Sequence, residues 1–313
     1  MKFGVYIRAG TTYSSMLELA QQAEKLDYFG VFLNDHVHGF ANEGKEPYLE
    51  AWSAMTGIGV QTKKIRLGHS VLFNSLRNPA FLAKSIATLD QMTNGRYELL
   101  IGAGWNKPEY EGYDLMEKGR GMPSAKERVD RFEEALQILR GMLHNETFSY
   151  EGKYWKLNNA INIPQPIQNP FRISVGADKP RMIKITAKYA DGFNIPRNLK
   201  LLKEKIELLE PELEKNNKRL SDFFISGFSA IHIAKNNEEY DMIIKDLVTK
   251  GKRPKEELKQ YGFIGTPEIL VNKFRQATDL GVKMMISDLR PTNNISEMKD
   301  KLISFKDEVI SNL

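Results

Sequence analysis

The chain has 313 residues, no cysteine and a formal net charge of +5, and 41% of its residues are hydrophobic. This length suits one α/β barrel, a fold that typically takes about 250 residues or more. The lack of cysteine excludes disulfides, thiolate nucleophiles and cysteine-ligated zinc, and it fits a cytoplasmic protein. No apolar run reaches the roughly 18 residues of a membrane span.

The charge pattern also limits the partners we expect. Lysines alternate with glutamates on expected helices, and no basic stripe is interleaved with aromatic residues, so we expect no nucleic-acid partner. The five histidines show neither an HExxH motif nor metal-ligand spacing, so we expect no metal site. A small-molecule ligand remains the expected partner.

Short β-rich runs alternate with amphipathic helical patterns along the chain. The first helix is predicted to begin at the capping pair Ser15 and Glu18, and a later one at Asn78-Pro79, a cap followed by a first-turn proline. Residues 144–170 are predicted to leave the main fold, with a small hairpin at 148–157. The predicted strands are residues 3–9, 30–34, 65–72, 96–101, 172–175, 192–195, 224–233 and 283–288.

Eight strands, each followed by a helix, predict a single-domain (β/α)8 TIM barrel over residues 1–313. An open doubly wound sheet is disfavoured because no GxGxxG motif follows the first strand. In a parallel barrel the active site lies at the carboxyl ends of the strands. The residues that follow each strand are therefore the candidate site.

Two strand ends carry signals of ligand binding. Gly102 and Gly104, followed by Trp105, let the backbone approach a flat ligand because glycine lacks a Cβ. Gly176 and Ala177 enter a helix, whose N-terminal N–H groups suit a phosphate. The next residue, Asp178, either caps this helix or has its charge offset by Lys179 or Arg181, and Asn194 ends the following strand within reach of the same ligand.

Asp35 and His36 end the second predicted strand. A histidine titrates near neutral pH and suits proton transfer, with Asp35 fixing its tautomer. The alternative is a histidine that binds the loop backbone while Asp35 caps it. Arg77 either orders the loop after the third strand or meets an anionic group, and ordering is the favoured interpretation.

The order and spacing of several motifs resemble the luciferase-like superfamily of flavin and deazaflavin enzymes, and most of all its coenzyme F420-dependent branch. The similarity is strongest over residues 1–195. The motifs that carry it are Asp35-His36, Arg66-Leu67-Gly68, Ser70-Val71, Arg77-Asn78-Pro79, Leu82-Ala83-Lys84, Thr88-Leu89-Asp90, Gly95-Arg96, Gly102-Ala103-Gly104-Trp105, Glu127-Arg128, Arg131-Phe132-Glu133-Glu134-Ala135-Leu136 and Tyr189-Ala190-Asp191-Gly192.

The resemblance implies a flat redox ring at the strand ends, a cis peptide between Ser70 and Val71 that presses on this ring, and a phosphate held near Gly176 and Ala177. It also implies proton transfer by His36 and, by analogy, a homodimer. The chain departs from the sugar- and alcohol-oxidising members of this branch at two positions. Trp105 stands where they often have glutamate, and Phe40 stands where they have tryptophan. Glu109 either replaces the missing acid or is a carboxylate on the loop surface.

The resulting hypothesis is an F420-dependent oxidoreductase that transfers a hydride between the deazaflavin and an unidentified organic substrate, in the manner of methylene-tetrahydromethanopterin reductase. One alternative is an FMN-dependent luciferase-like monooxygenase. A second is a non-catalytic barrel that binds flavin.

Overall fold

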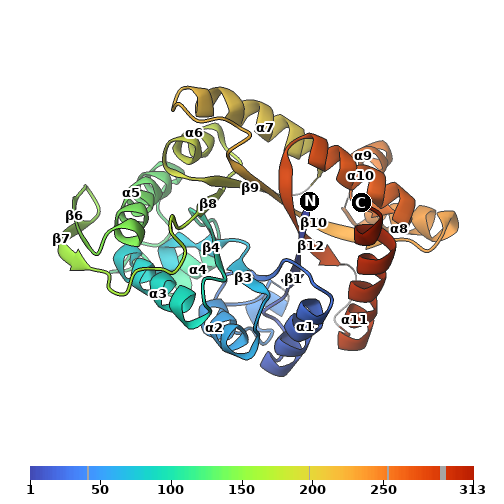
Figure 1. Cartoon of the computed structure of the whole chain (residues 1–313), viewed down its shortest axis with the longest axis horizontal. Helices are drawn as coiled ribbons and strands as arrows, with labels where there is room; N and C mark the ends of the chain where they lie inside the picture. The colour runs from blue at the N-terminus through green and yellow to red at the C-terminus, as the bar shows by residue number, and fades with distance from the viewer. Residues whose placement is uncertain (41, 197, 252–253, 290–293) are drawn as a thin grey trace.

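The computed structural model describes residues 1–40, 42–196, 198–251, 254–289 and 294–313. Parallel strands form a ring, and pairing between β9 and β10 closes it, which confirms the predicted TIM barrel (Figure 1). In ring order the strands are β1 (Lys2–Ile7), β2 (Gly30–Leu33), β3 (Arg66–His69) with β4 (Leu72–Phe73), β5 (Tyr97–Gly102), β8 (Ile173–Gly176), β9 (Gly192–Pro196), β10 (Phe224–Ile233) and β12 (Val282–Leu289).

Helices between the strands cover the outside of this ring, as Figure 1 shows. Their apolar residues pack on the strands in one continuous core. The helices are α1 (Tyr13–Lys25), α2 (Ala51–Gln61), α3 (Pro79–Met92), α4 (Lys107–Gly112), α5 (Ala125–His144), α6 (Pro180–Tyr189), α7 (Leu199–Glu214), α8 (Asn237–Gly251), α9 (Lys255–Tyr261), α10 (Pro267–Asp279) and α11 (Ile295–Ser304).

The structure corrects some predicted boundaries. Helix α1 begins one turn earlier than predicted, because the Thr12 hydroxyl rather than that of Ser15 caps it and accepts a hydrogen bond from the Ser15 N–H at 3.3 Å. The third predicted strand is two short strands, β3 and β4. The hairpin predicted at 148–157 is an antiparallel pair of β6 (Thr147–Glu151) and β7 (Lys156–Ile161), which extends beyond the predicted bounds. The short strand β11 (Ile264–Gly265) and the helices α8 and α9 precede α10.

Apolar side chains fill the inside of the barrel below its carboxyl-end mouth. Phe32, Leu100, Met284 and Ile286 form a buried cluster there. Gly68 makes room for the Phe32 ring, since a Cβ on this glycine would lie 2.6 Å from that ring. The barrel is therefore a packed core rather than a pore, and ligand space is left at the mouth.

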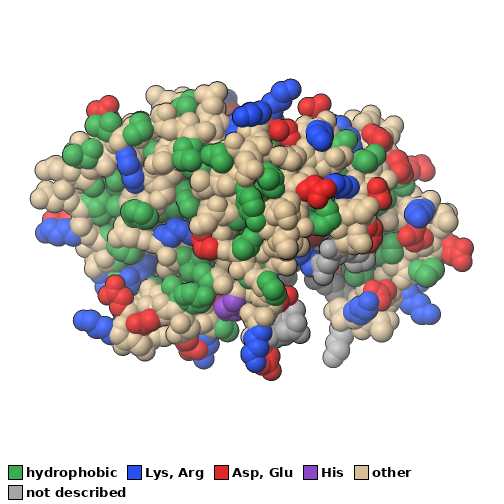
Figure 2. Space-filling model, turned by 90° about the horizontal axis from the view of Figure 1, so that it is seen from below, with side chains coloured by type: hydrophobic (Ala, Val, Ile, Leu, Met, Phe, Trp, Pro, Cys, Tyr) green, Lys and Arg blue, Asp and Glu red, His purple; other side chains and the backbone are tan. Residues whose placement is uncertain are grey.

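The outer surface mixes charges of both signs. Figure 2 shows Lys and Arg side chains interspersed with Asp and Glu on the face drawn there, without a continuous basic band. None of the helices in the described part of the chain combines the length and apolar character that a membrane crossing requires.

Lys273 is a buried ammonium group that holds the α9–β11 turn to α10. Its Nζ donates to the carbonyls of Lys259 at 2.8 Å, Gly262, and Ile264 at 3.4 Å. We expect Lys273→Met to lower the free energy of unfolding by about 1–3 kcal/mol, because it leaves buried carbonyls without a donor. Urea denaturation checks this, and Lys283→Met, which removes a single contact to the Ser221 carbonyl, is the matched control. Equal losses of unfolding free energy in the two variants would contradict the stabilising role assigned to the buried Lys273 hydrogen bonds.

Candidate active site

A cavity of about 930 Å³ opens at the carboxyl ends of the barrel strands. The ends of β2, β4, β5, β8 and β9 line it, together with the first turns of α5 and α6. The structure brings every predicted site residue except Glu109 to the cavity wall, namely Asp35, His36, Ser70, Val71, Gly102, Gly104, Trp105, Gly176, Ala177, Asp178 and Asn194. The barrel thus gathers residues that are far apart in the sequence.

Val71 forms an apolar wall between two glycines. The Ser70-Val71 peptide bond is cis, as the family resemblance implied. A Cβ on Gly102 or on Gly176 would lie 2.9 Å from a Val71 methyl group, so neither strand end tolerates a side chain there. Gly104 is equally constrained, with φ of +81° and a Cβ position that the Phe73 ring already occupies. Because these glycines lack a Cβ, the strand ends can pack directly against the side chains of Val71 and Phe73.

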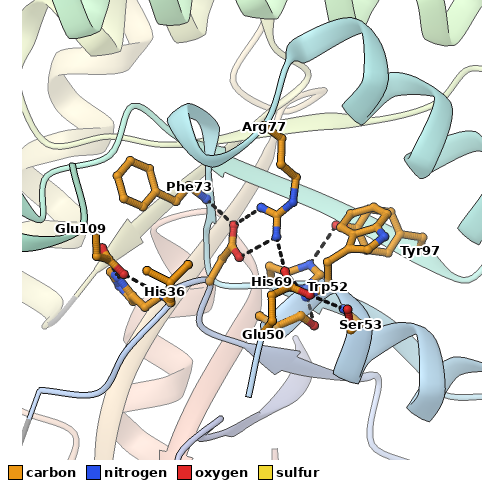
Figure 3. Close-up of polar contacts among 12 residues, drawn as sticks. His36, Glu50, Trp52, Ser53, His69, Phe73, Arg77, Tyr97 and Glu109 are labelled. Carbon is orange, nitrogen blue, oxygen red and sulfur yellow. Dashed lines mark hydrogen bonds and ion pairs between the residues drawn. The ribbon is translucent and has the colours of Figure 1, made fainter. Parts of the chain in front are cut away.

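His36, which lines the cavity, pairs with the buried carboxylate of Glu109 behind it (Figure 3). The His36 Nδ1 lies 2.9 and 3.0 Å from the two carboxylate oxygens of Glu109, and the Val37 N–H donates to the same carboxylate at 2.8 Å. Glu109 is fully buried, so the interpretation as a loop-surface carboxylate was wrong. Helix α4 turns it inward, and the contact reaches across 73 residues of sequence.

The protonation of Glu109 follows from its surroundings. Burial alone would raise its pKa, but the hydrogen bonds from His36 and the Val37 N–H outweigh burial and lower the pKa below its ordinary value of 4.5. Glu109 is therefore a carboxylate at neutral pH and accepts the Nδ1 proton. This leaves Nε2 as the ring nitrogen of His36 that is available for proton exchange.

A pH dependence of stability follows from this lowered pKa. Folding favours the Glu109 carboxylate, so its contribution is complete above pH 4.5 and is lost as the pH falls through the lower pKa of the folded state. We expect the stability difference between wild type and Glu109→Gln to shrink as the pH falls below 4.5. Urea denaturation from pH 7 down to pH 3 (about the range in which carboxylates titrate) measures it. If the stability difference between wild type and Glu109→Gln grows as the pH falls, the pKa of Glu109 is not lowered by folding.

Asp35 has a structural partner other than the one predicted. Its carboxylate accepts from Arg77 in a bidentate pair at 2.6 and 3.0 Å and from the Phe73 N–H at 2.8 Å (Figure 3). The prediction that Asp35 fixes the His36 tautomer is therefore wrong, because Glu109 holds Nδ1. Asp35 instead ties the end of β2 to β4, and the favoured ordering role of Arg77 is confirmed.

The network continues from Arg77 into α2. Arg77 also pairs with Glu50 at 2.5 Å, and Glu50 caps α2 by accepting from the Trp52 and Ser53 N–H groups. Trp52 stacks on His69, a buried residue of β3, at a centroid distance of 5.7 Å. The network therefore joins the cavity wall to a rigid helix end.

The far end of the cavity lies at the start of α6. The N-cap of this helix, Lys179, makes no side-chain capping bond, so the first-turn N–H groups keep their capacity to bind an anion. Asp178 does not cap the helix. Its carboxylate lies 3.1 Å from Lys205 of α7 and 3.6 Å from Lys179, whereas Arg181 pairs with Asp130 of α5. The Asp178 charge is thus offset mainly by a lysine that was not predicted.

Sequence reasoning missed one side of the cavity. The first turn of α5 contributes Ala125, Lys126, Arg128 and Val129 to the wall. Ser124 caps this helix by accepting from the Glu127 N–H at 3.1 Å, and the capping-box spacing of Ser124 and Glu127 was the available signal in the sequence. The sequence places this helix start after a long loop, and nothing in it shows that the loop returns to the mouth.

Comparison with known proteins agrees with this geometry. A model of the luciferase-like monooxygenase family matches residues 1–287. The chain belongs to this family. A curated relative, the F420-dependent glucose-6-phosphate dehydrogenase of Amycolatopsis mediterranei, is 31% identical over 180 residues, which are 57% of this chain and 52% of the relative. The chain thus matches about half the length of such relatives.

Two solved structures share the fold over almost the whole chain. An F420-dependent secondary alcohol dehydrogenase in complex with an F420-acetone adduct has a TM-score of 0.82 at 19% identity, covering 99% of this chain and 98% of its own. The coenzyme F420-dependent tetrahydromethanopterin reductase from Methanopyrus kandleri has a TM-score of 0.76 at 19% identity, covering 99% of both chains. At these identities the likeness establishes the architecture.

Proposed function

We propose that the chain is an F420-dependent oxidoreductase that exchanges a hydride and a proton with an organic substrate at the barrel mouth. The observation that carries this proposal is the His36–Glu109 pair at one end of a cavity whose other end is built for an anion. The F420-dependent relative supports the choice of cofactor.

The residues present fit a flat ring with an anionic tail. The cavity volume lies within the usual range for a small-molecule or cofactor site, about 300–1,000 Å³. Ser70, Val71, Gly102, Gly104 and Trp105 would border the ring. Gly176, Ala177, Asp178, Asn194 and the first turn of α6 would border the tail, since the α6 N–H groups and the cations of α5 and α6 suit phosphate. When bound, F420 supplies two-electron hydride chemistry.

The chain itself supplies binding and proton exchange. With Nδ1–H bound to the Glu109 carboxylate, His36 offers Nε2 to accept a proton from, or donate one to, a substrate oxygen or nitrogen. Glu109 stabilises the imidazolium form during this exchange, because it stays ionised at neutral pH. The aromatic residues beside His36 exclude water from one side of its ring.

Parallel titrations with F420 and FMN test the proposal. We expect F420 to bind with a dissociation constant in the micromolar range or below and to displace any bound FMN. Binding of FMN alone would favour the luciferase-like monooxygenase alternative and overturn the F420 assignment. If neither cofactor binds, the redox assignment itself fails, and if F420 binds without turnover of any carbonyl or alcohol substrate, the non-catalytic barrel is favoured.

A further inference from the structure

Two large aromatic side chains next to His36 are exposed: Trp105 lines the cavity, and Phe40 packs against the His36 ring. Phe40 is 57% exposed and Trp105 is 64% exposed. Their rings lie within 11° of parallel at a centroid distance of 5.9 Å, and we call this pair the aromatic platform. Each ring also meets His36 edge-on, at 4.7 Å for Phe40 and 5.8 Å for Trp105. The platform therefore offers exposed apolar ring surface next to the proton-exchanging group.

The backbone fixes both members of the platform. The Phe40 N–H donates to the Glu46 carboxylate at 2.8 Å. Trp105 follows Gly104, whose positive φ and contact with Phe73 fix the direction in which the chain leaves β5. A ligand that stacks here needs little rearrangement of the protein, and binding to a pre-formed surface avoids the cost of ordering it.

Charge separates the two ends of the cavity. The cations that line it, Lys126, Arg128, Lys179 and Arg181, come from α5 and the start of α6. The ionised group next to the platform is the Glu109 carboxylate, paired with His36. None of these lining cations belongs to the platform, which presents uncharged ring surface, so an uncharged ring of the substrate suits the platform better than a phosphate does.

We propose that the aromatic platform binds an uncharged planar ring of the substrate by stacking and holds the reacting group of that substrate beside His36. This inference rests on the proposed function and names its substrate class, which is aromatic or heteroaromatic carbonyl compounds rather than sugar phosphates. Trp105 and Phe40 become specificity-determining residues of the site.

Calorimetric titration of the F420-loaded protein with matched probes tests the inference. Acetophenone and cyclohexyl methyl ketone have the same number of carbons and the same carbonyl group, and only the first has a planar ring. We expect the dissociation constant of acetophenone to be lower by about fivefold, the range expected for aromatic stacking beyond burial of area. Glucose 6-phosphate, the third probe, should bind more weakly than either ketone.

Variants locate the effect on the platform. Trp105→Ala and Phe40→Ala should each abolish the preference for acetophenone, whereas Trp105→Phe and Phe40→Trp should keep it. Phe81→Ala on α3 is the matched control. Trp105 lines the cavity and Phe40 meets the lining residue His36 edge-on, whereas Phe81, which is 69% exposed, is not a lining residue. The urea denaturation midpoint of each variant, measured separately, shows that the protein remains folded; F420 affinity is not the fold control, because Trp105 also borders the proposed ring site.

The outcomes separate this inference from the proposed function. If the wild-type protein does not bind F420, the proposed oxidoreductase function is overturned. The two ketones are then titrated into the protein without cofactor to test the platform by itself. Equal binding of the two ketones, tighter binding of glucose 6-phosphate, or an unchanged preference in both alanine variants would overturn the platform while leaving the F420 assignment intact.

Discussion

Replacing His36 with asparagine should lower kcat by about 100- to 10,000-fold, the usual contribution of a positioned general acid or base. The asparagine amide takes the place of Nδ1 and can still donate to Glu109, so the buried carboxylate keeps its partner. The variant lacks Nε2 and therefore cannot exchange a proton with the substrate. Turnover of a carbonyl substrate accepted by wild type, followed through the F420 absorbance, measures the effect.

Controls separate chemistry from structure in this experiment. The F420 dissociation constant and KM should stay within about threefold of wild type, because the lost interaction acts mainly in the transition state. His38→Asn is the matched control two residues away, since the His38 Nδ1 contacts only the neighbouring Gly39 carbonyl among the contacts seen here. If His36→Asn retains wild-type kcat, His36 does not transfer the proton.

A Glu109 variant tests whether this carboxylate acts on the reaction through His36. Glu109→Gln removes the charge that stabilises protonated His36, so it should lower kcat less than His36→Asn does. The double variant should be no slower than His36→Asn alone, because residues that act as one unit are non-additive. Additive losses would show that Glu109 acts on the reaction independently of His36.

The sequence predicted most of the barrel because its signals are local. Asn78 caps α3 through the Ala80 and Phe81 N–H groups as predicted, and the seventh predicted strand coincides with β10. Such features depend on neighbours within a few residues and on short β-rich runs, which the sequence displays directly. The same strand ends then fixed the cavity wall, since parallel strands all end at one mouth.

The polar partners within the site were less predictable, because they depend on tertiary contacts. Asp35 and His36 are adjacent, yet Asp35 binds Arg77, 42 residues on, and His36 binds Glu109, 73 residues on. Successive residues at a strand end point in different directions, so their partners come from different loops. A single sequence carries no signal for which carboxylate turns inward, so it left open whether Glu109 replaces the missing acid or lies on the loop surface.

Arg77→Met should lower the free energy of unfolding by about 3–5 kcal/mol, the cost of leaving one member of a buried ion pair without its partner. The side chain of Asp35 is only 1% exposed and would keep a charge with the Phe73 N–H as its remaining donor among the contacts seen here. Urea denaturation at neutral pH measures the loss.

Two further variants show whether the pair or the packing is responsible. Arg77→Lys keeps the charge but loses the bidentate geometry, so we expect an intermediate loss of stability. Asp35→Asn combined with Arg77→Met should recover part of the loss, because no buried charge is then unpaired. If the double variant is as unstable as the sum of the two single variants, the two residues stabilise the protein through separate contacts. Recovery would show instead that Asp35 and Arg77 act as one tie between β2 and β4. F420 affinity should stay below that of wild type even when stability recovers, because the double variant lacks the ion pair that positions the Ser70–Val71 wall of the cavity.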